Sequence, residues 1–484
     1  MTFNSFPFLI FYPIVAALYF LLPKKLKWPM LLIASYYFYA FYQAELLFLI
    51  IGTTFVSWIS SLIIEKSSSR ILKRIVLAVA LTVCLGILIF YKYFNFLGES
   101  IVSIVNLFGI ETSPLILNLA LPVGISFYTF QTLSYVIDVY RGEVETERNF
   151  FFYALFVSFF PQLVAGPIER PGNLIPQLKA EHRFNKEDAT EGAKYMLIGF
   201  FKKICVADLV AVYVNAVYND VANATALGVI IATVLFAVQI YCDFSGYTDI
   251  ATGCARVMGI KLMKNFDRPY SATSIKDFWS RWHISLSGWF KDYLYIPLGG
   301  SRCPKWRYLL NLFIVFLVSG LWHGASWTFV IWGALHGVYR IVGALTYNAR
   351  NRLVLHTGHK LDSPIVAISR RIITFILVCF AWLFFRANSV SDAFALLGVI
   401  FTGWGSVGES LKLMGLGAVE IAMCIVSVLL LIALDRLHTY DTDKRRSDPL
   451  IKSGSFLYLL WVVALAWALL LSSDIESYFI YFQF

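Results

Sequence analysis

The sequence predicts an all-α, polytopic membrane protein. Hydrophobic residues make up 59% of its 484 residues and charged residues only 14%, whereas soluble domains are roughly 45–50% apolar. The mean hydropathy is +0.70. Charged side chains gather between apolar runs of about 20 residues, the length that a helix needs to cross a bilayer. Because there is no repeat of fixed period and no flexible linker, we expect one membrane domain over residues 1–484.

Apolar runs and basic loops alternate along the chain. The first basic loop is Lys24–Lys27, and a second, Glu65–Arg74, follows the third run. Basic loops collect on the cytoplasmic side of a membrane, so we expect both loops there and both termini outside. We expect about twelve spans. They lie near residues 6–22, 28–43, 45–64, 75–91, 118–138, 194–216, 225–242, 308–322, 325–345, 370–386, 415–434 and 455–473.

Composition argues against several other classes of protein. The net charge of +10 does not indicate a nucleic-acid partner, since basic loops between spans account for it. The seven cysteines are scattered without a Cys-x-x-Cys pair, so we expect neither a disulfide framework nor a metal site. The first apolar run lacks a basic leader and a small-residue cleavage site, which indicates a retained span rather than a signal peptide.

Three segments interrupt the regular pattern. Residues 150–168 are apolar but flanked by charge, which indicates a re-entrant or interfacial segment that ends in the helix-breaking run Ala165–Pro171. Tyr241–Asp249 is polar and broken by glycine. Its two aspartates are expected to hold neighbouring helices by hydrogen bonds or, alternatively, to act as acids or bases. Tryptophans and basic residues alternate within Lys261–Arg307, which indicates an interfacial helix framing a cytoplasmic mouth.

The stretch Ser319–Trp327 places His323 among small and aromatic residues inside a long apolar run. An ionisable side chain at membrane depth is costly, so it is by default a candidate functional group, the alternative being a core histidine bonded to a neighbouring helix. A desolvated histidine tends to stay neutral, and neutral imidazole can accept a hydroxyl proton. Gly320 and Gly324 flank it and can leave room for a substrate, let helices pack closely, or do both.

These signatures resemble those of the membrane-bound O-acyltransferase superfamily, in particular its bacterial branch of alginate and peptidoglycan O-acetyltransferases and the teichoic-acid D-alanylation protein. The resemblance runs from the first spans to the last residue, and it is most specific in Gln239–Asp249, Asn265–Gly300 and Ser319–Gly324. Where relatives often have Trp-Arg-Arg-Trp-His, this chain has Trp279-Ser280-Arg281-Trp282-His283, which loses one possible basic contact and keeps the histidine.

The resemblance implies helices arranged around a central tunnel, in which an acyl group passes from a cytoplasmic thioester to a hydroxyl presented from outside. His323 matches the catalytic histidine of the family, and His283 matches its second active-site position. Acetyl-CoA is the implied acyl donor, and no metal is expected. We expect Arg281, Trp282 and Lys291 to contribute to donor binding, although positive-inside topology explains the same basic residues.

The last stretch, Phe479–Phe484, is either the end of an aromatic belt or an acyl relay. A small partner protein of the D-alanylation system ends in a similar motif, so we hypothesise that Tyr481 accepts the acyl group with His323 as base. The resemblance also implies a bacterial inner-membrane location, surrounding membrane lipid, an extracytoplasmic serine esterase-like acetyltransferase as partner and a cell-envelope polysaccharide as acceptor.

Other functions stay open from the residues alone. D-alanyl transfer to teichoic acid is the nearest alternative within the enzyme class. A transporter would also need broken helices and intramembrane polar groups, but no symmetry between the two halves of the chain is evident. A non-catalytic scaffold is the third alternative, and the pair of histidines argues against it.

Overall fold

The computed structural model describes residues 1–164 and 166–442, and all regular elements in these ranges are helices. This confirms the predicted all-α class. The chain divides into two compact units. The first comprises Met1–Met196, Ile250–Lys264 and Lys291–Tyr293, and the second comprises Leu197–Asp249, Asn265–Phe290 and the chain from Leu294. The predicted span at 455–473 and Tyr481 lie outside the described residues, and the single domain stays a prediction.

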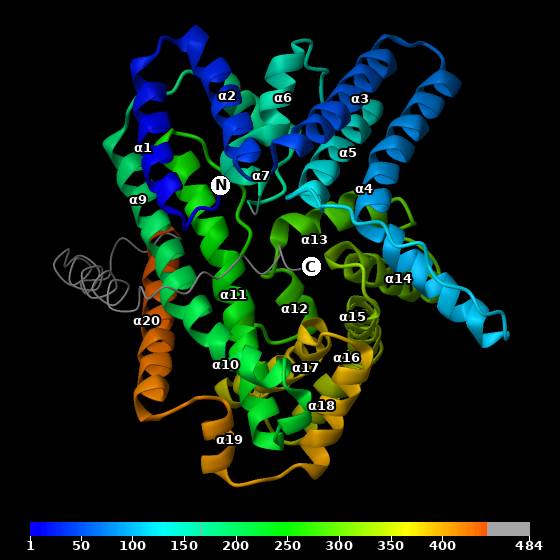
Figure 1. Ribbon diagram of the computed structural model, residues 1–484, viewed down its shortest axis with the longest axis vertical. Helices are drawn as coiled ribbons and strands as arrows, with labels where there is room; N and C mark the ends of the chain where they lie inside the picture. The colour runs from blue at the N-terminus through cyan, green and yellow to red at the C-terminus, as the bar shows by residue number, and fades with distance from the viewer. Residues whose placement is uncertain (165, 443–484) are drawn as a thin grey trace. The chain divides into compact units, whose positions relative to one another are not determined.

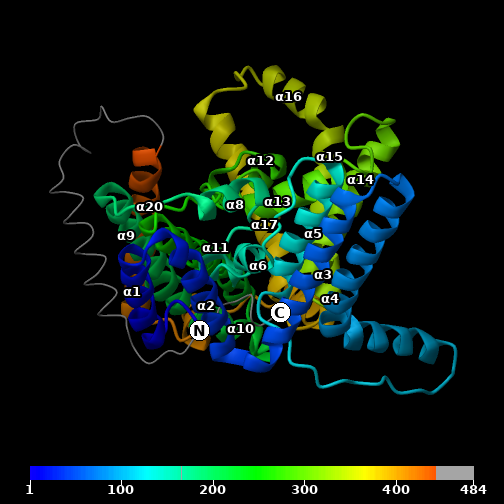
Figure 2. The same cartoon turned by 90° about the horizontal axis from the view of Figure 1, so that it is seen from above.

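The first unit contains a bundle of long helices. Its helices are α1 Phe6–Leu21, α2 Lys24–Gln43, α3 Leu47–Lys66, α4 Arg70–Leu107, α5 Ile125–Arg141, α6 Phe150–Ser158, α7 Phe160–Leu163, α8 Pro171–Lys179 and most of α9 Lys186–Phe200. Helices α3, α4 and α5 lie side by side in both views (Figure 1, Figure 2). Buried hydroxyl groups of α3 form hydrogen bonds within the helix or with a neighbouring helix. For example, Ser57 Oγ lies 2.8 Å from the hydroxyl oxygen of Tyr153 in α6.

The segment predicted to be re-entrant ends before the helix-breaking run, as expected, since α7 ends at Leu163 and α8 begins at Pro171, but it also has a break that was not predicted. Helix α6 has nine residues and α7 has four, so neither is long enough to cross a bilayer. The break falls at Phe159, directly before a helix whose second residue is Pro161. Pro161 lacks a backbone N–H and its ring would clash with the preceding turn of a continuous helix, whereas the first turn of α7 accommodates it. Their side chains are almost all buried, which places this irregular backbone inside the protein.

The second unit carries the remaining α-helices and a π-helix. They are the π-helix Phe201–Asp208, α10 Leu209–Tyr218, α11 Ala226–Val257, which continues into the first unit, α12 Ile275–Trp279, α13 Ile284–Phe290, α14 Lys305–His323, α15 Trp327–Leu345, α16 Tyr347–His356, α17 Pro364–Arg386, α18 Val390–Thr402, α19 Val407–Leu413 and α20 Ala418–Thr442. Helices α14 and α15 form a tight antiparallel pair, and α17 packs on α15 (Figure 1).

Twelve spans are not confirmed. Within the described residues, six helices are long and apolar enough to cross a membrane: Ala44–Lys66, α4, α11, α14, α15 and α17. Helices α19 and α20 together pass the same test but are bent by 80°. Helix α4 has 38 residues and runs far beyond the span predicted at 75–91. The protein therefore has several apolar spans, as expected of a polytopic membrane protein, and the finer count stays a prediction.

Two predicted interruptions are wrong. Tyr241–Asp249 is not broken by glycine, because α11 runs through it without a break. Gly246 instead allows the end of α9 and the start of the π-helix to approach, since a methyl group there would lie 2.8 Å from Gly199 O and 3.2 Å from Lys203 N. The single interfacial helix expected in Lys261–Arg307 is also absent from the structure. The short helices α12 and α13 replace it, and Trp282 between them is fully buried.

Candidate active site

His323 is the last residue of α14, and the residue is buried, with an exposed fraction of only 3%. The chain then turns through an extended Gly324, and α15 begins after Ser326, whose hydroxyl accepts a hydrogen bond from Thr328 N. The ring of His323 meets Trp332 edge to face at a centroid distance of 4.9 Å and Phe385 at 5.5 Å. The predicted position of His323 at the joint of two nearly fused helices is confirmed.

The glycines beside His323 are packing residues. A methyl group at Gly324 would overlap the ring of Phe329, and one at Gly320 would overlap the carbonyl oxygen of Phe329 and approach Gly333 Cα to 3.0 Å. The space above both glycines is therefore already filled by neighbouring residues. Of the two alternatives that the sequence left open, the structure supports close helix packing rather than an open approach for substrate.

His283 lies between α12 and α13 with φ +44°, a left-handed conformation that non-glycine residues rarely adopt. Such strain persists only where the surroundings impose it, and it is most common at functional sites. Asn265 supplies the local restraint. Its carbonyl oxygen accepts a hydrogen bond from Ile284 N at 2.9 Å, and its side-chain oxygen Oδ1 accepts from Ser285 N at 3.2 Å and from Ser285 Oγ at 2.8 Å.

The same amide determines the tautomer of His283. His283 Nδ1 lies 3.1 Å from Asn265 Oδ1. The backbone N–H of Ser285 can only donate a hydrogen bond, so the Asn265 side-chain atom that faces it must be the oxygen Oδ1. An amide oxygen can only accept a hydrogen bond. Nδ1 must therefore carry the proton, and Nε2 is the basic nitrogen of the neutral ring. Burial lowers the pKa of His283 to about 3, so the ring is neutral at physiological pH.

Trp322 brings the two predicted histidines together. Its ring meets His283 at a centroid distance of 5.9 Å and His323 at 5.0 Å, both in edge-to-face geometry. Forty residues of sequence separate the histidines, yet both lie against one indole in the second unit. The structure therefore places the two residues that the sequence singled out in a single buried aromatic site.

A third histidine lies behind this pair. His336 of α15 is fully buried, and its Nδ1 accepts a hydrogen bond from Trp279 Nε1 at 3.2 Å. Trp332 lies between His323 and His336, at a centroid distance of 4.9 Å from each. No role for His336 or Asn265 was predicted from the sequence. For His336 the signal was available, because it is also an ionisable residue in an apolar run. For Asn265 the sequence gave no signal except that it begins the stretch Asn265–Gly300, on which the family resemblance partly rests.

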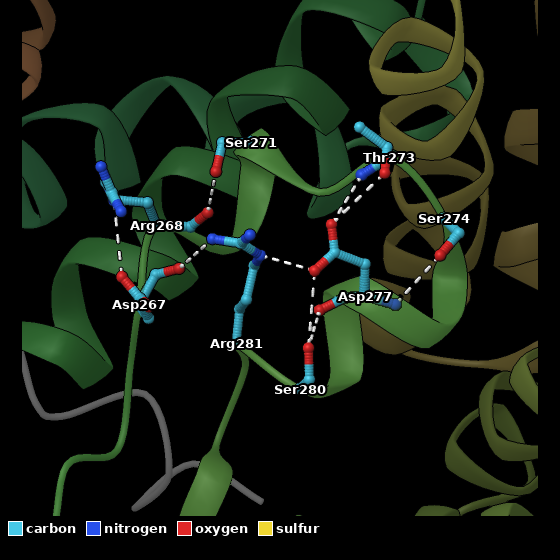
Figure 3. A network of polar contacts seen from close by, with 8 residues as sticks. All are labelled: Asp267, Arg268, Ser271, Thr273, Ser274, Asp277, Ser280 and Arg281. Carbon is cyan, nitrogen blue, oxygen red and sulfur yellow. Dashed lines mark hydrogen bonds and ion pairs between the residues drawn. The ribbon is translucent and has the colours of Figure 1, made fainter. Parts of the chain in front are cut away.

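Arg281 and Trp282, which were expected to bind the donor, have partners within the second unit. Arg281 Nε lies 2.7 Å from Asp277 Oδ1, and Arg281 Nη1 donates to the Asp267 carbonyl (Figure 3). Asp277 also accepts from Thr273 N at 3.0 Å, so one carboxylate ties this loop to α12. Trp282 stacks on Phe278 at a centroid distance of 5.6 Å.

Lys291, the third expected donor contact, is exposed and belongs to the first unit. Arg281 and Trp282 belong to the same unit as His283. The contribution of all three to donor binding stays a prediction.

The aspartates of α11 form buried ion pairs. Lys203 Nζ, on a side chain with 1% exposure, lies 2.5 Å from Asp243 Oδ1 and 2.9 Å from Asp208 Oδ1. Lys202 Nζ lies 3.0 Å from Asp249 Oδ2. These contacts join α11 to the π-helix and favour the structural reading of the aspartates. π-helical segments often lie at functional sites. Here the segment places Lys202 and Lys203 so that both pair with aspartates of α11.

The charged residues of the Gly-Pro-Ile-Glu-Arg-Pro run also have partners in the first unit. Glu169 is fully buried, and its carboxylate accepts from Met263 N and from Asn173 Nδ2 at 2.7 Å. Burial raises the pKa of Glu169 to about 7, and those hydrogen bonds limit the rise. Arg170 forms an ion pair with Asp292 at 2.9 Å and lies over the ring of Tyr293. The side chains of this turn are therefore largely buried in protein.

Comparison with known proteins identifies the family. The family model described as MBOAT, membrane-bound O-acyltransferase family, matches residues 143–386. The chain is 37% identical to the probable alginate O-acetylase AlgI of Pseudomonas aeruginosa, over 94% of this chain and 85% of that protein. It is 35% identical to the peptidoglycan O-acetyltransferase of Helicobacter pylori, over 80% and 77%. It is 28% identical to the teichoic acid D-alanyltransferase of Bacillus subtilis, over 61% and 78%. The chain that holds these histidines is an acyltransferase and belongs to the membrane-bound O-acyltransferase family.

Proposed function

We propose that this protein moves an acetyl group from cytoplasmic acetyl-CoA across the membrane for O-acetylation of an extracytoplasmic cell-envelope polysaccharide. The observation that carries the proposal is the pair His283 and His323 on one indole, within a chain whose similar proteins include named O-acetylases. The chain is less similar to the D-alanyltransferase, at 28% identity over 61% of its length, than to the two O-acetylases. Acetyl transfer is therefore favoured.

The proposed chemistry uses a neutral histidine as general base. The acceptor hydroxyl attacks the thioester carbonyl carbon, the carbon–sulfur bond breaks, and the hydroxyl proton passes to imidazole and then to the leaving thiolate. We assign the base to His323, which lies at a helix end. His283, whose Nδ1 proton is held by Asn265, positions the donor through its basic Nε2. The aromatic walls exclude water, which would otherwise hydrolyse the thioester.

The location and the remaining partners belong to the same proposal. We place the protein in a bacterial inner membrane with both termini outside, where Tyr481 relays the acyl group to an extracytoplasmic serine esterase-like partner. The basic loops that support this orientation are Lys24–Lys27 and Glu65–Arg74. Arg281, Trp282 and Lys291 are proposed donor contacts.

The test is mass spectrometry of cell-envelope polysaccharides from cells with and without the protein, together with His323→Asn and Tyr481→Phe. Loss of a general base lowers the rate by roughly 10²–10⁴-fold, so polymer acetylation should fall to background in His323→Asn. His356→Asn, which changes an exposed histidine of α16, is the matched control. Normal acetylation in His323→Asn would sink the assignment of the base. Normal acetylation in Tyr481→Phe would sink the relay alone.

A further inference from the structure

A basic cavity lies in the first unit, where α1 ends and α2 begins. It has a volume of about 460 Å³ and is lined by four lysines, Lys24, Lys25, Lys27 and Lys179, with Glu147 as its one acidic residue. The volume is within the range of small-molecule sites. The histidine site is in the other unit, so the acyl-transfer proposal makes no use of this cavity.

Two of the four lysines are held in place by the protein. Lys179 Nζ pairs with the buried Glu147 at 2.5 Å. Lys27 Nζ donates to the His182 carbonyl at 2.7 Å and lies over the ring of Tyr19. Lys24 and Lys25 are exposed and form no ion pair with any residue in the ranges that the structure describes. The cavity therefore has positive charge that the described polypeptide does not neutralise.

The backbone adds to that positive charge. Helix α2 begins at Lys24, its N-cap residue Pro23 offers no side-chain hydrogen bond, and its first turn contains no acidic residue. The start of a helix carries the positive end of its dipole, where cations are unfavourable and anions favourable. Lysines at this helix start are stabilised when an anion lies among them. A helix start with free N–H groups is also a common binding place for phosphate.

The neighbouring surfaces suit a lipid. Large apolar side chains of both helices are exposed, including Leu21 at 80% and Ile33 at 70%. Tyr19 and Trp28 line the cavity, and such amphipathic aromatic residues are typical of the headgroup level of a membrane. A ligand with a phosphate in the cavity and acyl chains along the outer faces of α1 and α2 would satisfy both features.

We propose that this cavity binds the phosphate of an anionic phospholipid headgroup. Lys24 and Lys25 donate to the phosphate oxygens, and Lys27 and Lys179 form the fixed wall of the site. Basic cavities beside membrane helices bind such headgroups by the same electrostatic attraction. The bound lipid then stabilises the first unit, so the protein is more stable in membranes rich in anionic lipid.

The test is native mass spectrometry of the full chain in neutral detergent, titrated with phosphatidylglycerol or with zwitterionic phosphatidylcholine. Lys24→Gln/Lys25→Gln should weaken phosphatidylglycerol binding about 30-fold, from the contribution of each lysine near an anionic lipid. Lys66→Gln/Arg74→Gln, which removes the same charge from exposed positions in the other predicted basic loop, should leave it unchanged. Phosphatidylglycerol should also raise the thermal midpoint of the wild type and not that of the first variant.

Three results would overturn the proposal. Equal weakening by the two double variants would show a general charge effect. Equal affinity for the two lipids would show that the anionic headgroup is not recognised. Displacement of phosphatidylglycerol by millimolar inorganic phosphate would identify a site for a free anion instead of a lipid.

Discussion

Gly320→Ala tests whether close packing of α14 on α15 positions His323. The new Cβ would lie 3.0 Å from Gly333 Cα, 3.2 Å from Gly333 N and closer still to the Phe329 carbonyl oxygen. Carbon atoms in contact prefer roughly 3.5–4.0 Å, so the helices would have to separate by roughly 1 Å. Overpacking of this kind costs about 1–3 kcal/mol.

The same displacement should reduce activity, because His323 is three residues further along α14. A misplacement of roughly 1 Å at a reacting group can lower a rate about 100-fold. We expect a lower thermal midpoint in detergent and a fall in polysaccharide acetylation of that order. Gly333→Ala should behave alike, and the double variant should be non-additive, since both methyl groups compete for one space.

Gly86→Ala is the control for Gly320→Ala. Gly86 lies inside α4, and a methyl group there would have no neighbour within 4 Å. Alanine in a helix interior is about 0.5–1 kcal/mol more favourable than glycine, so this variant should keep its activity and be slightly more stable. If Gly320→Ala matched Gly86→Ala in stability and activity, the packing argument would be refuted.

Three further predictions concern buried polar groups. Asn265→Ala should lower acetylation about 100-fold, because His283 loses the acceptor that orients it, whereas Asn265→Asp keeps an acceptor and should be less impaired; equal activity in both would contradict this. Lys203→Met leaves two buried carboxylates facing each other and should cost about 3–5 kcal/mol, against about 0.2–1 kcal/mol for Lys194→Met at a half-exposed pair, as measured by thermal unfolding. Glu169, with its pKa raised from 4.5 to about 7, holds its proton more tightly when folded, so stability should fall by up to about 3 kcal/mol as pH rises from 4.5 to 7. Glu169→Gln should flatten that pH profile, and an unchanged profile would refute the assignment.

Several parts of the fold followed from local sequence. Apolar runs predicted helices close to their observed positions, and α14 and α15 meet at His323 as expected. The end of the helix before the run Ala165–Pro171 was also predictable, because proline acts through its own backbone, whereas the break at Phe159 was not predicted. Gly246 was misread as a helix break. A glycine inside a helix is equally consistent with the close approach of another element, which depends on residues distant in sequence.

The candidate site was predictable only in part. The rarity of ionisable side chains in apolar runs singled out His323, and the family motif added His283. The burial of Trp282 was missed because alternating aromatic and basic residues suit a membrane surface and a protein interior alike. Asp243 and Lys203 lie on separate helices. The sequence of either helix alone could not identify which residue pairs with Asp243.

By itself, the sequence determined the helical class, the membrane character and the two histidines, because composition and short motifs act locally. The tertiary structure alone decided that Trp322 contacts both histidines, that Asn265 sets the tautomer of His283 and that Gly320 faces Gly333. Each of these depends on how separate elements of the chain pack against one another. Such contacts arise from how helices pack, which the pattern of any one helix does not specify.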